Sequence, residues 1–169
     1  MQPGSPHQAP PYGQQPSTGN PAGAVFLAFF ASVVVSLIYT GVVFAMYKAQ
    51  SSAVPWWLLY ILHGLLNGVV VGALAGLVGR GSNGARVGAA VIAPLGVFFG
   101  YANILPLLFA DSSGFESVRF MLENDPFFPA RSWWNMTTDR PLVSLLGIGV
   151  AAVAAWGLAY AVGRRGRRS

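Results

Sequence analysis

Residues 56–81 read WWLLYILHGLLNGVVVGALAGLVGRG, and this stretch decides the fold. From position 56 to position 79 it contains no charged side chain. A helix of this length, roughly 24 residues at 1.5 Å each, extends about 36 Å. The hydrocarbon core of a bilayer is about 30 Å thick. The stretch therefore predicts a transmembrane helix over residues 56–79.

Three further uncharged apolar runs cover residues 24–47, 87–109 and 141–162. Hydrophobic residues make up 54% of the chain and charged residues only 9%, whereas a soluble domain has about 25% charged residues. The sequence thus predicts an all-α integral membrane protein, a four-helix bundle formed by one domain over residues 23–163. Pro94 lies inside the third run, so we expect a kink there.

The segments outside the spans have distinct compositions. Residues 1–22 are rich in Pro and Gln, which predicts a disordered tail. The connection 110–140 holds all five acidic residues, and Ser113 to Glu116 form a capping-box pattern. We expect a short amphipathic helix there on the membrane surface. This loop either closes one end of the bundle or serves as a lid or partner platform.

The distribution of basic residues predicts the orientation. Arg80, Arg86 and the four arginines of the tail 164–169 fall on one side of the four spans, with no acidic residue beside them. Basic residues near span ends mark the cytoplasmic side, so we expect cytoplasmic termini and an outside loop. The arginine, alanine and glycine content favours a bacterial cytoplasmic membrane. The basic C-terminal tail predicts contact with anionic lipid, and no folded basic surface predicts a nucleic-acid partner.

Polar side chains recur at one depth of the predicted bundle. Thr40, His63 and Asn103 each lie six or seven residues below the outer end of a span, and Asn67 lies one turn deeper than His63. Unpaired polar groups in hydrocarbon are costly, so these residues should face each other. They form either an interhelical hydrogen-bond lock or a small pocket. In such a pocket His63 could relay a proton or bind a polar head group or a quinone.

Small and hydroxyl residues recur at four-residue spacing. Ser32, Ser36 and Thr40 share one face of the first span, which we expect to meet another helix rather than lipid. The second span carries a ladder of four glycines that lets a neighbouring backbone approach closely: Gly64, Gly68, Gly72 and Gly76. The ladder either packs inside the bundle or binds a membrane partner or a second copy.

The sequence offers few sets of residues that could form a catalytic site. The chain has no cysteine, and its predicted spans contain one histidine and no acidic residue, so we expect no metal site, no haem and no other cofactor. Ser32, Ser36 or Ser144 could pair with His63, but no G-x-S-x-G motif accompanies them. We therefore expect a non-enzymatic accessory or scaffold subunit. The alternatives are an oligomeric transporter or channel component that uses the polar layer, and a membrane enzyme acting on lipid or peptide.

Overall fold

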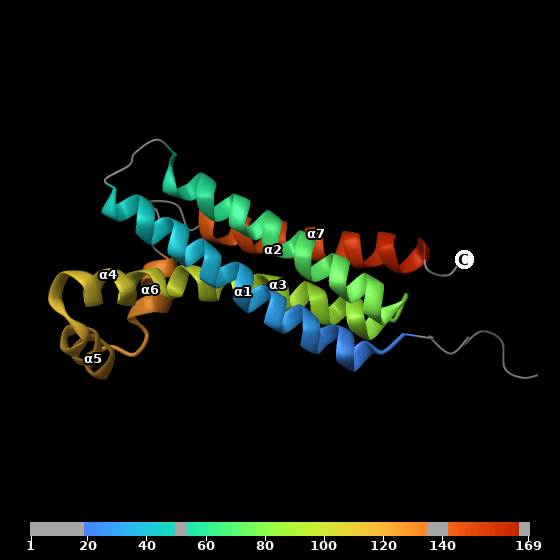
Figure 1. Ribbon diagram of the computed structural model, residues 1–169, viewed down its shortest axis with the longest axis horizontal. Helices are drawn as coiled ribbons and strands as arrows, with labels where there is room; N and C mark the ends of the chain where they lie inside the picture. The colour runs from blue at the N-terminus through green and yellow to red at the C-terminus, as the bar shows by residue number, and fades with distance from the viewer. Residues whose placement is uncertain (1–18, 50–53, 135–141, 166–169) are drawn as a thin grey trace, which may run out of the picture.

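The computed structural model describes residues 19–49, 54–134 and 142–165. Regular structure in these ranges is entirely helical, as predicted, in the order α1 (Pro21–Lys48), α2 (Trp56–Gly79), α3 (Asn83–Ala102), α4 (Ile104–Ser113), α5 (Phe115–Asn124), α6 (Phe128–Trp134) and α7 (Leu142–Arg165). The long helices lie side by side, α4 to α6 gather at one end, and α1 begins and α7 ends at the other (Figure 1). We call these the loop end and the terminal end. Most of the predicted tails, and loop residues 135–140, fall outside the described ranges.

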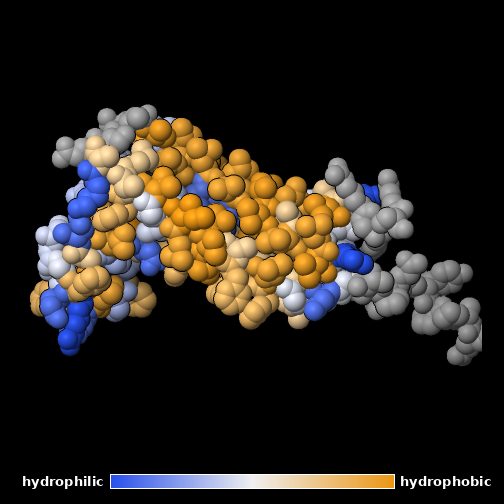
Figure 2. Space-filling view, in the orientation of Figure 1, coloured by the Kyte–Doolittle hydropathy of each residue, from blue (hydrophilic) through white to orange (hydrophobic). Residues whose placement is uncertain are grey.

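Within the described residues, four helical stretches are long and apolar enough to cross a membrane: α1, α2, α3 with α4, and α7. Large apolar side chains such as Phe26, Leu37 and Val153 point outward and are more than half exposed. Figure 2 shows that hydrophobic residues cover most of the middle of the visible face, around a small hydrophilic patch, and that hydrophilic residues are more frequent toward both ends. Soluble monomers rarely expose apolar patches beyond a few hundred Å², so the surface is that of a membrane protein.

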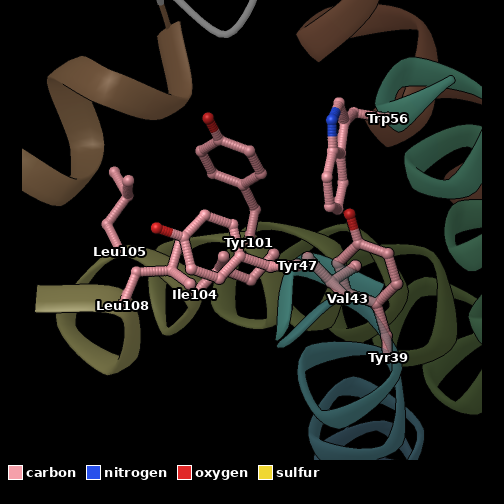
Figure 3. A pocket seen from close by; sticks show the side chains of 8 residues that line it. All are labelled: Tyr39, Val43, Tyr47, Trp56, Tyr101, Ile104, Leu105 and Leu108. Atoms are coloured by element: carbon pink, nitrogen blue, oxygen red, sulfur yellow. The ribbon is translucent and has the colours of Figure 1, made fainter. Parts of the chain in front are cut away.

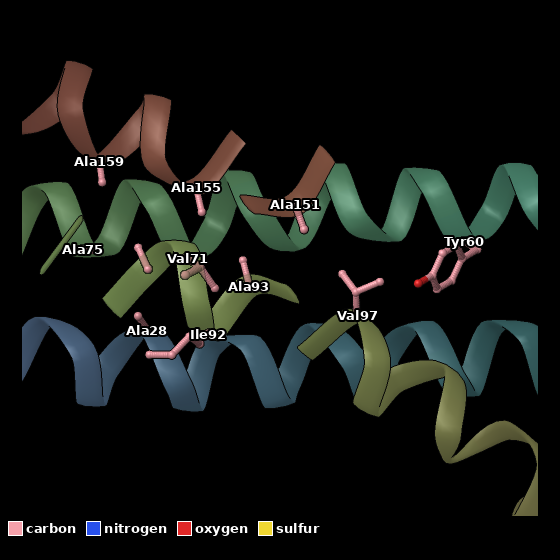
Figure 4. Close-up of a cluster of buried hydrophobic side chains, with 11 residues drawn as sticks. Ala28, Tyr60, Val71, Ala75, Ile92, Ala93, Val97, Ala151, Ala155 and Ala159 are labelled. Atoms are coloured by element: carbon pink, nitrogen blue, oxygen red, sulfur yellow. The ribbon is translucent and has the colours of Figure 1, made fainter. Parts of the chain in front are cut away.

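The interior of the bundle consists mainly of small side chains. Ala28, Ala75 and Ala93 are buried at the helix contacts, together with Ala151 and Ala155 of α7 (Figure 4). Helices α1 and α7 each pack on both α2 and α3, which places α2 and α3 in the middle of the bundle. Because alanine adds little bulk, the backbones approach closely, as is common between membrane helices.

Helix α1 begins three residues before its predicted start. The Asn20 side chain accepts a hydrogen bond from the Gly23 amide (2.9 Å), and Pro21 takes the first helical position, both typical of a helix N-terminus. The backbone amide of Asn20 also donates to the Val78 carbonyl at the end of α2 (3.1 Å). Residues 20–22, predicted as part of a disordered tail, are therefore ordered against α2.

The third predicted span is interrupted, but not at Pro94. Helix α3 runs through Pro94, and the break lies at Asn103, between α3 and α4. Pro106 lacks the amide N–H that would donate to the Ala102 carbonyl, and in a continuous helix its ring would clash with that carbonyl. This explains why α3 ends at Ala102. Pro106 then stands in the first turn of α4, where proline is tolerated.

The predicted loop is more helical than expected. Helix α4 continues to Ser113, and Gly114 separates it from α5 with a φ of +81°, a conformation that favours glycine. The predicted capping box is wrong, because Ser113 ends α4 and α5 has no side-chain cap. Helix α5 does carry exposed apolar residues, as an amphipathic surface helix should. Lys48 at the end of α1 pairs with Asp111 of α4 (2.7 Å).

Candidate functional site

The glycine ladder of α2 packs against α7 of the same chain. A Cβ at Gly64 would lie 2.6 Å from the Gly147 carbonyl oxygen, and one at Gly72 would lie 2.5 Å from that of Ala155. Gly68 and Gly76 meet α7 in the same way. The ladder is thus filled inside the bundle, and this surface is not free to bind a partner.

Hydroxyl groups of α1 contact the backbone of α3. The Ser36 hydroxyl lies 2.7 Å from the Gly96 carbonyl oxygen, and the Thr40 hydroxyl lies 2.9 Å from that of Gly100. Each hydroxyl also contacts the carbonyl four residues earlier in α1, so its single proton is shared. The predicted helix-facing side of α1 is confirmed, because it meets α3.

Asn67 of α2 completes this contact from the other side. Its amide nitrogen donates to the Ser32 hydroxyl (3.0 Å) and to the Ala93 carbonyl (2.8 Å). A Cβ at Gly96 would fall 2.5 Å from that nitrogen, so glycine is what admits the amide. We call Ser32, Ser36, Thr40 and Asn67 the polar seam. The Ser36, Thr40 and Asn67 side chains donate to backbone carbonyls or to Ser32, while the Oδ1 atom of Asn67 has no partner among the described residues. These bonds join α1, α2 and α3 as an interhelical lock.

His63 lies near the seam but is bonded to none of it. Its side chain is 4% exposed, and its ring stacks on Tyr39 at 4.1 Å between centroids and 5° between planes. A Cβ at Gly100 would lie 2.6 Å from its Cε1 atom. Within the described residues neither ring nitrogen has a hydrogen-bond partner. Both His63 and Thr40 therefore meet Gly100, as expected of residues at one depth.

The other polar residues predicted near His63 lie elsewhere. The Asn103 side chain donates to the Phe99 carbonyl of α3 (2.7 Å), and within the described residues no hydrogen bond joins it to the seam. None of the three candidate serines is within hydrogen-bond reach of His63: two belong to the polar seam, and Ser144 donates to the Trp133 carbonyl (2.6 Å). The structure assembles no Ser/His pair in the part of the chain it describes.

A cavity of about 330 Å³ opens beside Tyr39 near the loop end of the bundle. It is lined from α1, α2, α3 and α4 by Tyr39, Val43, Tyr47, Trp56, Tyr101, Ile104, Leu105 and Leu108 (Figure 3). In Figure 3 the hydroxyl of Tyr39 points toward the ring of Trp56. Tyr39 stacks on His63 as well, so its ring stands between the cavity and the imidazole. We call this space the tyrosine cavity.

The tyrosine cavity combines apolar walls with unused polar groups. Four of its eight lining residues are aromatic and the other four are aliphatic. In the described ranges no hydrogen bond involves the hydroxyls of Tyr39, Tyr47 and Tyr101 or the indole of Trp56. Apolar cavities with a few convergent polar groups are typical of small-molecule sites. Sequence reasoning did not identify this cavity.

A second polar network closes the loop end. The Trp133 indole of α6 donates to the Tyr60 hydroxyl (2.8 Å), which donates to the Ser144 carbonyl (3.1 Å). Gly147 admits the Tyr60 ring, which a Cβ there would overlap. Sequence reasoning missed this network. The network fixes α6 to α2 and α7, which supports the closing role predicted for the loop over a movable lid.

In the described ranges no three His, Cys, Asp or Glu side chains gather as a metal site. The groups that remain available at the tyrosine cavity are aromatic rings, phenolic hydroxyls and, behind Tyr39, the imidazole of His63. Comparison of the chain with family models, curated proteins and solved structures finds no match.

Proposed function

We propose that this membrane protein is non-enzymatic and binds the ring-bearing head group of an amphiphile, such as a quinone, in the tyrosine cavity. The observation that carries the proposal is the cavity itself, with four aromatic residues around about 330 Å³. This volume lies at the lower end of the roughly 300–1,000 Å³ typical of ligand pockets. It suits a single ring better than a whole lipid.

Different lining residues would contact the ring, its carbonyl oxygens and the alkyl tail of such a ligand. Aromatic side chains favour stacked or edge-to-face contact with a planar ring. The hydroxyls of Tyr39, Tyr47 and Tyr101 can donate to carbonyl oxygens of that ring, while Leu105 and Leu108 offer apolar contact to an alkyl tail. A rotation of Tyr39 would add the unpartnered nitrogens of His63 to the site.

The test compares two adjacent valines of α1. Val43 lines the tyrosine cavity and is 3% exposed, whereas Val42 faces outward and is 46% exposed. We expect mass spectrometry of organic extracts from the purified protein to find one amphiphile with the wild type and with Val42→Phe. Val43→Phe fills the cavity and should lose that compound. Equal content in all three proteins would refute the proposal.

A second candidate function is that of an accessory subunit that binds a membrane partner through α5. Helix α5 packs on α4 and exposes Phe115 (83%) and Phe120 (69%). The glycine ladder no longer supports partner binding, so α5 carries this hypothesis alone. A partner that co-purifies in mild detergent should be lost with Phe115→Ser and Phe120→Ser but kept with Phe26→Ser, which changes an equally exposed residue of α1 at the other end.

We also propose that both termini are cytoplasmic and that α4 to α6 lie outside, in a bacterial cytoplasmic membrane. Support comes from the charges: the terminal end carries Arg80, Arg86 and Arg164, while every acidic residue belongs to positions 111–139. Because the chain has no cysteine, Ser82→Cys and Ser117→Cys can be labelled singly. An impermeant maleimide added to intact cells should modify only the cysteine at position 117.

A further inference from the structure

Two arginines at the terminal end share one aromatic ring. The guanidinium carbon of Arg86 in α3 lies 4.8 Å from the ring centroid of Tyr160 in α7, and that of Arg164 lies 5.2 Å from the same centroid. Arg164 also donates to the Tyr160 hydroxyl (2.9 Å). Arg86 donates to Asn83 (3.2 Å), but its buried Nε atom has no hydrogen-bond partner among the described residues. We call Arg86, Tyr160 and Arg164 the arginine cluster.

Among the described residues, no carboxylate pairs with either guanidinium of the arginine cluster. The five acidic residues of the sequence stand at positions 111–139, between the third and fourth spans. Both guanidinium groups stay charged at any physiological pH. Because they lie against the same ring, their positive charges repel each other, and a bound anion would reduce this repulsion. Their planar forks match the geometry of phosphate oxygens. An anion is therefore the ligand that this arrangement recognises.

We propose that the arginine cluster binds the phosphate of an anionic phospholipid in the leaflet at the terminal end. A lipid suits the site better than free phosphate because apolar surface continues below it. Trp156 and Val153 lie one and two turns before Tyr160 on the same face of α7, and they are 45% and 74% exposed. A phosphate on the cluster would place acyl chains along this surface. This site is separate from the tyrosine cavity, and neither proposal depends on the other.

The experiment measures binding of phosphatidylglycerol to the full-length protein in detergent by native mass spectrometry. The test variant combines Arg86→Gln with Arg164→Gln. The control variant, Arg167→Gln with Arg168→Gln, removes the same charge from the adjoining tail. Each charge-assisted contact to a phosphate contributes at least about 1.5 kcal/mol, or roughly 10-fold, so we expect about 100-fold weaker binding in the test variant. We expect a much smaller loss in the control and no competition by glycerol phosphate.

Three results would overturn the proposal. Wild-type affinity in the test variant would remove the cluster from lipid binding, and an equal loss in the control would reduce the effect to bulk charge. Full competition by glycerol phosphate at equal concentration would assign the site to a soluble phosphate. If the test variant fails to fold, lipid binding by Arg86→Lys tests the proposal instead. It keeps the charge but loses the planar fork, so undiminished binding would contradict the geometry argued above.

Discussion

A methyl group added at Gly72 should separate α2 from α7. Its Cβ would lie 2.5 Å from the carbonyl oxygen and 2.8 Å from the Cα of Ala155, and both are backbone atoms that cannot rotate away. To reach the 3.4 Å of ordinary contact, α7 must withdraw by about 0.9 Å, from 2.5 to 3.4 Å. A gap of about 0.5–1 Å removes a quarter to a half of the dispersion energy of each atomic contact along the interface.

The expected cost of Gly72→Ala follows from these contacts. Overpacking a tight interior destabilises by roughly 1–3 kcal/mol, and the higher helix propensity of alanine returns at most about 1 kcal/mol. Gly157 of α7 is the control, because a Cβ there meets nothing within 4 Å. Stability is measured by unfolding in a denaturing detergent, monitored by circular dichroism. Gly72→Ala should be less stable than the wild type, and Gly157→Ala should be as stable as the wild type or more stable. Equal stability of the two variants would refute close packing at the ladder.

Three further predictions concern polar side chains; the first two use the same unfolding assay, and the third uses amide exchange. Asn67→Ala removes two interhelical hydrogen bonds and should cost about 1–3 kcal/mol; a neutral result would contradict the lock. His63→Phe keeps the stack on Tyr39 and removes no hydrogen bond, so a large loss of stability would show that the imidazole has a partner. Tyr60→Phe loses its bond to Trp133, and faster amide exchange in residues 128–134 should follow, while unchanged exchange would argue against the network.

The sequence allowed the helices and their faces to be predicted where one physical rule dominates. The second span, 56–79, coincides with α2 because an uncharged run between Pro55 and Arg80 leaves no other end points. The four-residue spacing of Ser32, Ser36 and Thr40 identified a buried face, since a hydroxyl in hydrocarbon needs a partner. The spacing could not say which helix supplies that partner, because α3 uses backbone carbonyls that every sequence contains.

The parts that escaped prediction depend on tertiary contacts. Two prolines lie in the third span, and only the packed structure shows that the break falls at Asn103 rather than at Pro94. The tyrosine cavity arises where side chains of four helices leave space, which no local pattern records. The network of Tyr60 and Trp133 joins residues 73 positions apart, so only the fold brings them together.

The central claim, binding of a ring-bearing amphiphile in the tyrosine cavity, is tested most directly by fluorescence quenching with decylubiquinone. Trp56 lines the cavity and Trp57 does not, although both side chains are 47% exposed. In lipid nanodiscs, the wild type and Trp57→Phe should show a saturable quenching component that Trp56→Phe lacks. No saturable component in the wild type, or the same component in both variants, would contradict binding in this cavity.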